Sequence, residues 1–147
     1  RDRPRILVRQ IPSNKTYSIE AVLIDGDYIS DVNSHVVTNI KVNPNYLLGV
    51  INSKIISIWF LLKYDKFQRR VFPQFKIGEM SEFPIPNATE QQQEEIAHLV
   101  QSLMSEMLKN DKDNSKVELL NISIDELVMD LFGLTEEEKQ TVRDFEV

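Results

Sequence analysis

The segment from residue 44 to about residue 64 most constrains what this chain can fold into. It follows Asn43, a residue type that caps helices, and it begins with Pro44, which suits the first helical turn. Wound as a helix, it carries apolar side chains over most of its circumference. The narrow remaining stripe consists of Asn45, Gly49, Asn52 and Lys63. We therefore predict a central helix that is packed on several sides, with Gly49 marking the close approach of another backbone.

The residues before this helix predict a small, mostly antiparallel sheet. Residues 5–11 (RILVRQI) and 17–24 (YSIEAVLI) are rich in β-branched side chains, which is typical of strands. Asp25-Gly26-Asp27 is a turn signal, because glycine tolerates positive φ. A short returning strand at 28–30 and another strand at 35–40 complete the predicted sheet.

Residues 65–87 break the helical pattern and predict a segment rich in loops, because three prolines and a glycine interrupt it. We expect its four phenylalanines to anchor it to the core: Phe67, Phe72, Phe75 and Phe83.

The rest of the chain predicts helices. Thr89 and Gln92 form a capping-box pattern, and the helix after them carries a one-sided apolar stripe. The stripe consists of Ile96, Leu99, Val100, Leu103, Met104, Met107 and Leu108. The predicted fold class is therefore α+β, with a small sheet on a central helix followed by C-terminal helices.

Further capping signals follow a polar linker at 110–116. A second capping-box pattern at Ser123–Glu126 predicts a new helix start, and Gly133 is placed to end that helix. A third pattern at Thr135–Glu138 predicts a last helix.

Charge divides the chain into two unlike halves. Residues 1–78 hold 12 Lys and Arg against 6 Asp and Glu, a balance of +6. Residues 79–147 hold 5 against 17, a balance of −12, and the two add to the net charge of −6. The first half can attract a polyanion although the whole chain is acidic, because a net charge averages over both halves.

Basic and amide side chains gather at and after the predicted central helix. Lys and Arg neutralise phosphates, and Arg and Gln can also read guanine and adenine edges. The simpler interpretation, favoured on charge alone, is that these side chains only solubilise a surface. The set comprises Lys54, Lys63, Lys66, Gln68, Arg69, Arg70, Gln74 and Lys76, with a second basic set of Arg3, Arg5, Arg9 and Lys15.

Several kinds of chemistry have no sequence support. The chain has no cysteine, which excludes disulfides and thiol chemistry and fits a cytoplasmic protein. His35 and His98 lack the spacing of metal ligands, and His35 is either a base reader or, more often for such a residue, structural. No phosphate-binding loop, catalytic triad spacing or Asn-Pro-Pro-aromatic motif of adenine methyltransferases occurs. We expect no catalytic, cofactor or metal site in this chain, no membrane span, and a longer parent protein.

Two stretches together resemble a known family. Tyr46–Lys54 (YLLGVINSK) followed by Phe72–Pro86 (FPQFKIGEMSEFPIP) is similar to the TaqI-like C-terminal specificity domain. That family occurs in type II restriction-modification proteins and related adenine-specific DNA methyltransferases. Residues 6–10 (ILVRQ) and 34–37 (SHVV) resemble its strands, and residues 124–138 resemble its closing helix-Gly-Leu-Thr-acidic tail.

The resemblance implies a prokaryotic DNA-recognition domain that is not an enzyme by itself. In the family, an upstream domain binds S-adenosylmethionine and methylates a flipped adenine, and some members also cleave DNA. Residues 1–87 would then form the recognition core. Residues 88–147 would pack on it or on the upstream methyltransferase domain. The candidates for base edges are Gln68, Arg69, Arg70 and Gln74, and those for phosphates are Lys63, Lys66 and Lys76. Arg3, Arg5 and Arg9 are also expected to face DNA.

Three alternatives stay open. The order of Pro-Ile-Pro and a Gln-rich helix also resembles type I restriction specificity subunits, which bind methyltransferase subunits. The acidity and the apolar stripe at 96–108 fit a protein-interaction or dimerisation module without DNA binding. An enzyme with an unrecognised site, such as a nuclease, is the third.

Overall fold

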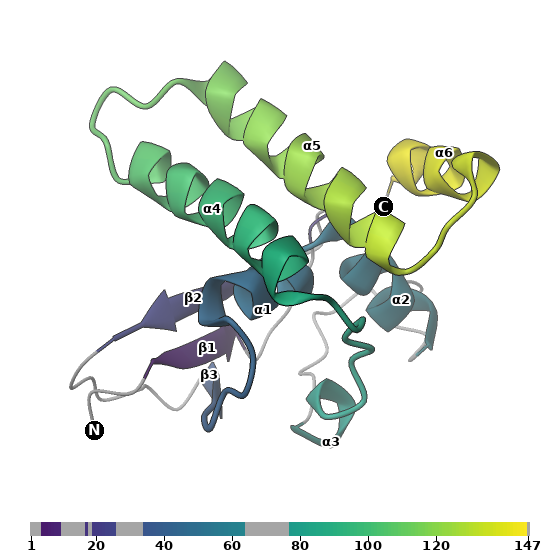
Figure 1. Ribbon diagram of the computed structural model, residues 1–147, viewed down its shortest axis with the longest axis horizontal. Helices are drawn as coiled ribbons and strands as arrows, with labels where there is room; N and C mark the ends of the chain where they lie inside the picture. The colour runs from purple at the N-terminus through teal and green to yellow at the C-terminus, as the bar shows by residue number, and fades with distance from the viewer. Residues whose placement is uncertain (1–3, 10–16, 18, 26–33, 64–76, 147) are drawn as a thin grey trace.

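Three layers make up the fold in the computed structural model of the chain (Figure 1). A three-stranded sheet lies on one side of helix α1 (Pro44–Ile51), and helices α4 (Glu90–Met107) and α5 (Asn114–Leu131) cover its other side. This arrangement confirms the predicted α+β class. The residues that the structure describes are 4–9, 17, 19–25, 34–63 and 77–146.

The sheet has the strand order β2-β1-β3, and both pairings are antiparallel. Its strands are β1 (Arg5–Arg9), β2 (Ala21–Ile24) and β3 (Ser34–Val37). The strand predicted at 17–24 therefore begins later, and the one predicted at 35–40 ends earlier. The return predicted at 28–30 lies outside the described residues.

The register of the sheet separates an inner from an outer face. Val8 lies opposite Ala21 and His35, and directly opposed residues in an antiparallel pair point to the same side. Val8 is fully buried and belongs to the main core, so this side faces α1. The inner face consists of Ile6, Val8, Ala21, Leu23, His35 and Val37, and the outer face of Arg5, Leu7, Arg9, Val22, Ile24, Ser34 and Val36.

The prediction of one helix from residue 44 to about residue 64 is wrong. The segment forms α1 and a second helix, α2 (Lys54–Lys63), which are bent by 52° at the break between them. Among the described residues, no single helix is long and apolar enough to cross a membrane, and α1 and α2 meet that criterion only when taken together.

Hydrogen bonds produce the break between α1 and α2. In a continuous helix, the carbonyl of Val50 would accept the amide of Lys54. Here it accepts the amide of Ser53 at 3.1 Å and the Ser53 hydroxyl at 2.6 Å. The side chain of Asn52 is also engaged, since it accepts from the amide of Ala21 and donates to the carbonyl of that residue. The sheet and the Ser53 side chain thus hold the residues of the break.

Gly49 marks a close approach, as its place in the helix predicted. The neighbours are side chains of α4 and α5 rather than another backbone. A Cβ at residue 49 would lie 2.9 Å from Cγ2 of Val100 and 3.1 Å from Cγ2 of Ile96. The missing side chain therefore lets α4 pack tightly on α1.

The segment before α4 contains the short helix α3 (Ile77–Met80) and returns to the core at Phe83. The Phe83 ring meets the rings of Trp59 and Phe60 edge to face, with centroids 5.8 Å and 6.3 Å apart. The prediction that Phe83 anchors this segment is confirmed. Phe67, Phe72 and Phe75 lie outside the described residues.

The helices α4 and α5 form an antiparallel hairpin (Figure 1). The predicted capping box of Thr89 and Gln92 is present at the start of α4. The predicted helix start at Ser123 is wrong, because Asp113 caps a helix that runs through Ser123 without a break. A capping-box pattern in the middle of a helix is ambiguous, since the packing of Ile124 and Val128 against the core keeps the helix continuous.

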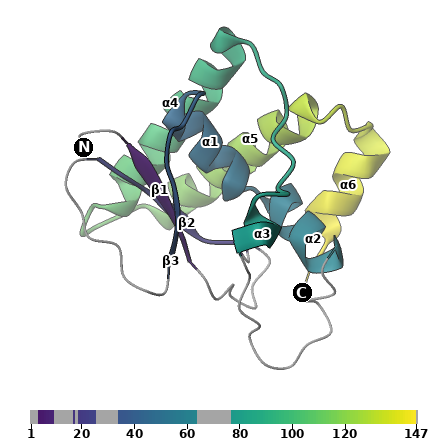
Figure 2. The same cartoon turned by 90° about the horizontal axis from the view of Figure 1, so that it is seen from below.

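Gly133 ends α5 with φ of 73°, as predicted. Its amide donates to the carbonyl of Asp130 and the amide of Leu134 to that of Met129, the pattern of a Schellman C-cap. The third predicted capping box, between Thr135 and Glu138, starts α6 (Glu136–Asp144). This last helix lies beside α2 (Figure 2).

Candidate nucleic-acid interface

Two of the predicted DNA contacts share the outer face of the sheet. Arg5 and Arg9 stand at the two ends of β1, and both point away from α1. Arg9 is exposed, and its Nη1 lies 2.8 Å from Oε1 of Glu20. Arg5 is partly buried, with its Nε inaccessible to solvent. Arg9 is thus available to a phosphate that competes with an exposed carboxylate, a type of pairing that is worth little in water.

Lys63 is the third described candidate, and it is the last residue of α2. Its side chain is exposed, and its Nζ lies 6.0 Å from the centroid of the Trp59 ring. Trp59 in turn contacts Phe83, so an aromatic cluster supports the end of the helix. This contact leaves the ammonium group of Lys63 on the surface.

The other candidates lie outside the described residues and stay predictions. They are Arg3, Lys66, Gln68, Arg69, Arg70, Gln74 and Lys76. The structure thus brings Arg5 and Arg9 together on one strand. Both views show α1 between the sheet and α2, so β1 and the helix that ends at Lys63 lie on different sides of α1 (Figures 1 and 2).

Two further residues have structural roles. Lys54, grouped with the DNA candidates on charge alone, points to the C-terminal end of α6, where its Nζ donates to the carbonyl of Arg143 at 2.7 Å. Its ammonium group is therefore engaged within the fold, which favours a structural role for this member of the basic set. His35 is partly buried on the inner face of the sheet opposite Val8, which favours the structural interpretation over base reading.

The layers also separate the charges. Three exposed glutamates belong to α4, whereas Arg9 stands on the outer face of the sheet. Figure 1 shows α4 and the sheet on opposite sides of α1. A polyanion that approaches the outer face of the sheet is therefore separated by the α1 layer from the helix that carries these glutamates. These glutamates are Glu90, Glu94 and Glu95.

A buried polar site at the start of α2 was not predicted from the sequence. The carboxylate of Asp125, in α5, accepts a hydrogen bond from the main-chain amide of Lys54 at 3.0 Å and another from the hydroxyl of Tyr17. Burial raises the pKa of Asp125 to about 6 and that of Tyr17 well above its usual range. The available signal was an acid between the apolar positions Ile124 and Val128, which the capping-box interpretation concealed.

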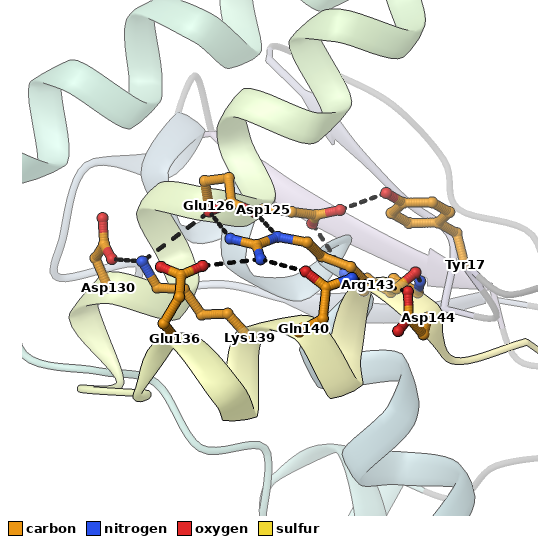
Figure 3. A network of polar contacts seen from close by, with 10 residues as sticks. Tyr17, Asp125, Glu126, Asp130, Glu136, Lys139, Gln140, Arg143 and Asp144 are labelled. Atoms are coloured by element: carbon orange, nitrogen blue, oxygen red, sulfur yellow. Dashed lines mark hydrogen bonds and ion pairs between the residues drawn. The ribbon is translucent and has the colours of Figure 1, made fainter.

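Ion pairs attach α6 to α5 next to this site (Figure 3). Arg143 donates to both carboxylate oxygens of Glu126, at 2.7 Å and 2.8 Å, and pairs with Glu136 at 2.9 Å. The hydrogen bond from Arg143 lowers the pKa of Glu126, and Lys139 pairs with Asp130. A bidentate arginine–carboxylate contact fixes geometry as well as charge, so α6 is held in a defined place against α5.

A shallow hollow of about 260 Å³ lies on the outer side of α4. Lys109 and Lys116 line it, and both pair with the Glu106 carboxylate, at 3.1 Å and 3.4 Å. Among the residues that the structure describes, no three His, Cys, Asp or Glu side chains are grouped so as to hold a metal ion.

A family model for the TaqI-like C-terminal specificity domain matches residues 1–85, which is more than half of the chain. The chain belongs to this family of specificity domains. The matched part includes the sheet, α1, α2 and α3, whereas α4, α5 and α6 follow it. A search of curated proteins by sequence found no match.

The fold of this specificity domain is also similar to part of a solved structure. That structure is of the Type IIL restriction-modification enzyme MmeI in complex with DNA, and the superposition has a TM-score of 0.71 at 14% sequence identity. The match covers 99% of this chain and 22% of the MmeI chain. The domain thus spans about a fifth of that enzyme, and the likeness includes the three C-terminal helices.

Proposed function

We propose that this specificity domain recognises a DNA target sequence for a restriction-modification enzyme. The single observation that carries the proposal is the family membership of residues 1–85. Two observations support it. The domain shares its fold with part of an enzyme that was solved with DNA, and the sheet that carries Arg9 lies across α1 from α4, which carries the exposed glutamates.

In this proposal the domain itself does no chemistry. It holds duplex DNA so that an upstream domain of the same polypeptide, or a separate methyltransferase subunit, can reach a flipped adenine. S-adenosylmethionine would be the cofactor of that methyltransferase. Phosphate contacts position the domain, and base contacts from Gln68, Arg69, Arg70 and Gln74 select the sequence.

The test begins with selection, because the target is unknown. A pool of duplexes with a randomised core is enriched on the immobilised chain, and the affinity of the enriched duplex is compared with that of a shuffled one by fluorescence anisotropy. We expect preferential binding of the enriched duplex and a linear fall of log K with log salt. Equal affinity for both duplexes would refute target recognition.

Charge reversal at the predicted base contacts gives the sharper variant. Arg69→Glu together with Arg70→Glu should weaken binding strongly and flatten the salt slope, since two cations near the phosphates become anions. Lys112→Glu, in the exposed turn between α4 and α5, is the matched control and should change neither quantity. An unchanged affinity in the double variant removes both arginines from the interface.

The methyltransferase part is tested with the parent protein. Incubation with the selected duplex and labelled S-adenosylmethionine should transfer methyl groups to an adenine within or beside that sequence. Transfer to cytosine, or no transfer, would contradict this part while leaving DNA recognition intact.

One observation favours a second function. The hairpin of α4 and α5 exposes large apolar side chains at Met107, Leu108, Leu119 and Ile122, which is typical of a protein-contacting surface. Sedimentation of the chain with and without duplex DNA discriminates the two functions. Self-association without DNA binding would favour the interaction module.

A further inference from the structure

The amide of Lys54 has two possible acceptors, one in a straight helix and one in the bent conformation that the structure shows. One is the carbonyl of Val50, which would continue α1 as a straight helix of the kind that the apolar pattern predicts. The other is the carboxylate of Asp125, which the amide meets at 3.0 Å. The bent conformation therefore gives this amide an acceptor that lies outside its own segment.

The residue before α2 does not cap this helix. In many helices a serine at this position would accept from an amide in the first turn. The Ser53 hydroxyl instead donates to the carbonyl of Val50 behind it. The first turn of α2 also contains no acidic residue. The cap of α2 is thus supplied from another helix, by a residue 71 positions away in sequence.

Asp125 suits this role by charge and by its own support. A carboxylate at the first amide of a helix interacts favourably with the helix dipole. Tyr17 donates to its second oxygen, which fixes the orientation of the carboxylate, and the side chain is only 7% exposed (Figure 3). The contact of Lys54 Nζ with the Arg143 carbonyl adds a second attachment from α6 to the same residue.

We infer that Asp125 is a positioning residue for DNA recognition, a cap from α5 that acts with Ser53 and Asn52 to hold the direction of α2 and so the place where Lys63 is presented. The inference rests on the proposed function. It also assigns a purpose to the C-terminal helices, which lie beyond the part that the family model matches. In sequence, α2 leads directly into the segment that holds Lys66, Arg69 and Arg70.

The geometric consequence is large. A helix of ten residues is about 15 Å long, so swinging α2 through the observed 52° would move its far end by about 13 Å. A displacement of this size removes Lys63 from any phosphate that it contacts in the bent conformation. Loss of the cap should therefore lower the apparent affinity in proportion to the population that straightens.

The experiment compares three variants in duplex binding at fixed salt, using the duplex enriched by selection. Asp125→Ala removes the acceptor and should weaken binding about five- to tenfold. Asp125→Asn keeps an acceptor oxygen for Lys54 and an amide that can donate to Tyr17, so it should bind like the original chain. Glu118→Ala removes an exposed carboxylate from the same helix and controls for charge.

Charge and positioning predict opposite signs for Asp125→Ala. Removing an anion should by itself favour binding to a polyanion, whereas loss of the cap should weaken it. Affinity that rises or stays unchanged in Asp125→Ala overturns the inference. A loss of duplex affinity in Asp125→Asn also overturns it, because this variant keeps the acceptor oxygen for the Lys54 amide.

A spectroscopic distance reports the direction of α2 without DNA. The chain has no cysteine, so cysteines introduced at the exposed positions Leu62 and Gln101 take spin labels selectively. Asp125→Ala should shift or broaden the distance distribution between α2 and α4, on the order of 10 Å. An unchanged distribution overturns the inference. Failure of the original chain to bind any duplex would refute the proposed function instead, and the label distances would still test the cap.

A pair of variants at Lys54 tests the cap from the donor side. Proline at residue 54 is tolerated at the first position of α2 but excluded from the interior of a straight helix, whereas alanine fits both. In an Asp125→Ala background, Lys54→Pro should therefore restore the label distance and the duplex affinity, and Lys54→Ala should not. Equal behaviour of the two double variants contradicts the inference.

Discussion

The side chain of Val100 in α4 fills the space in which a Cβ of residue 49 in α1 would stand, 2.9 Å from its Cγ2. This contact joins the central helix to the C-terminal hairpin, and the same glycine also meets Ile96. A single core cluster accordingly contains residues of the sheet, α1, α2, α4 and α5. The helices after residue 87 thus share a core with the part of the chain that the family model matches.

Gly49→Ala should destabilise the chain although alanine favours helices. The gain in helix propensity is about 1 kcal/mol, whereas overpacking a stiff core costs about 1–3 kcal/mol. We expect a net loss of about 1 kcal/mol in urea unfolding. Adding Val100→Ala should make the double variant less destabilised than the sum of the two single ones. If the changes in unfolding free energy of the two single variants simply add, residue 49 and Val100 do not clash.

Asp125→Asn should change the pH dependence of stability. Burial raises the pKa of Asp125 from its ordinary 3.8 to about 6 in the folded chain. A raised carboxylate pKa means that ionisation opposes folding, so this contribution destabilises above pH 6 and disappears as pH falls toward 4. A pKa shift of about two units corresponds to about 3 kcal/mol in the free energy of unfolding.

Urea unfolding at pH 7.5, 6 and 5 measures this difference. The unfolding free energy of the original chain should rise relative to that of Asp125→Asn as pH falls. Asp130→Asn, which changes a more exposed carboxylate in the same helix, is the control. Parallel curves for the original chain and Asp125→Asn would contradict the raised pKa.

Glu106→Gln should weaken the turn between α4 and α5 and alter its response to acid. The buried carboxylate accepts from the Asp113 amide at 2.8 Å and pairs with Lys109. These contacts, the Asp113 amide first, lower the pKa of Glu106 to about 2. A lowered pKa stabilises the fold above about pH 4.5, and this contribution is lost as pH falls toward 2.

Thermal unfolding of Glu106→Gln should therefore show a lower Tm at neutral pH and a smaller further loss between pH 4.5 and 3. Glu94→Gln, exposed on the same helix, should leave both quantities unchanged. If Glu106→Gln and the original chain lose the same Tm between pH 4.5 and 3, the Glu106 carboxylate does not cause that loss.

Arg9→Glu and Lys63→Glu test the described part of the candidate interface. Each should weaken duplex binding and reduce the salt slope by about 1 if its side chain neutralises one phosphate. The readout is anisotropy across a salt series, again with Lys112→Glu as the control. A loss in Lys63→Glu alone would restrict the interface to the α2 side of α1.

Local patterns were sufficient for several elements of this fold. The capping boxes at Thr89 and Thr135 and the glycine cap at Gly133 satisfy helix-end amides and carbonyls with residues three to five positions away. Residues 5–9 likewise form the strand that their β-branched side chains predicted, with Ile6, Leu7 and Val8 all buried. Such features depend on neighbours in the sequence, so reading the sequence can find them. Of the candidate site, Arg9 and Lys63 proved exposed, as DNA contacts require.

The sequence by itself determined the α+β class, the caps at Thr89, Gly133 and Thr135 and the separation of charge between the two halves. Only the tertiary structure decided that α1 ends at Ile51, that Lys54 points to α6 and that one helix runs through Ser123. The physical reason is the range of the interactions. A cap that joins residues a few positions apart can be recognised from the local sequence. The hydrogen bond between Asp125 and Lys54 joins residues 71 positions apart and forms only once the layers have packed.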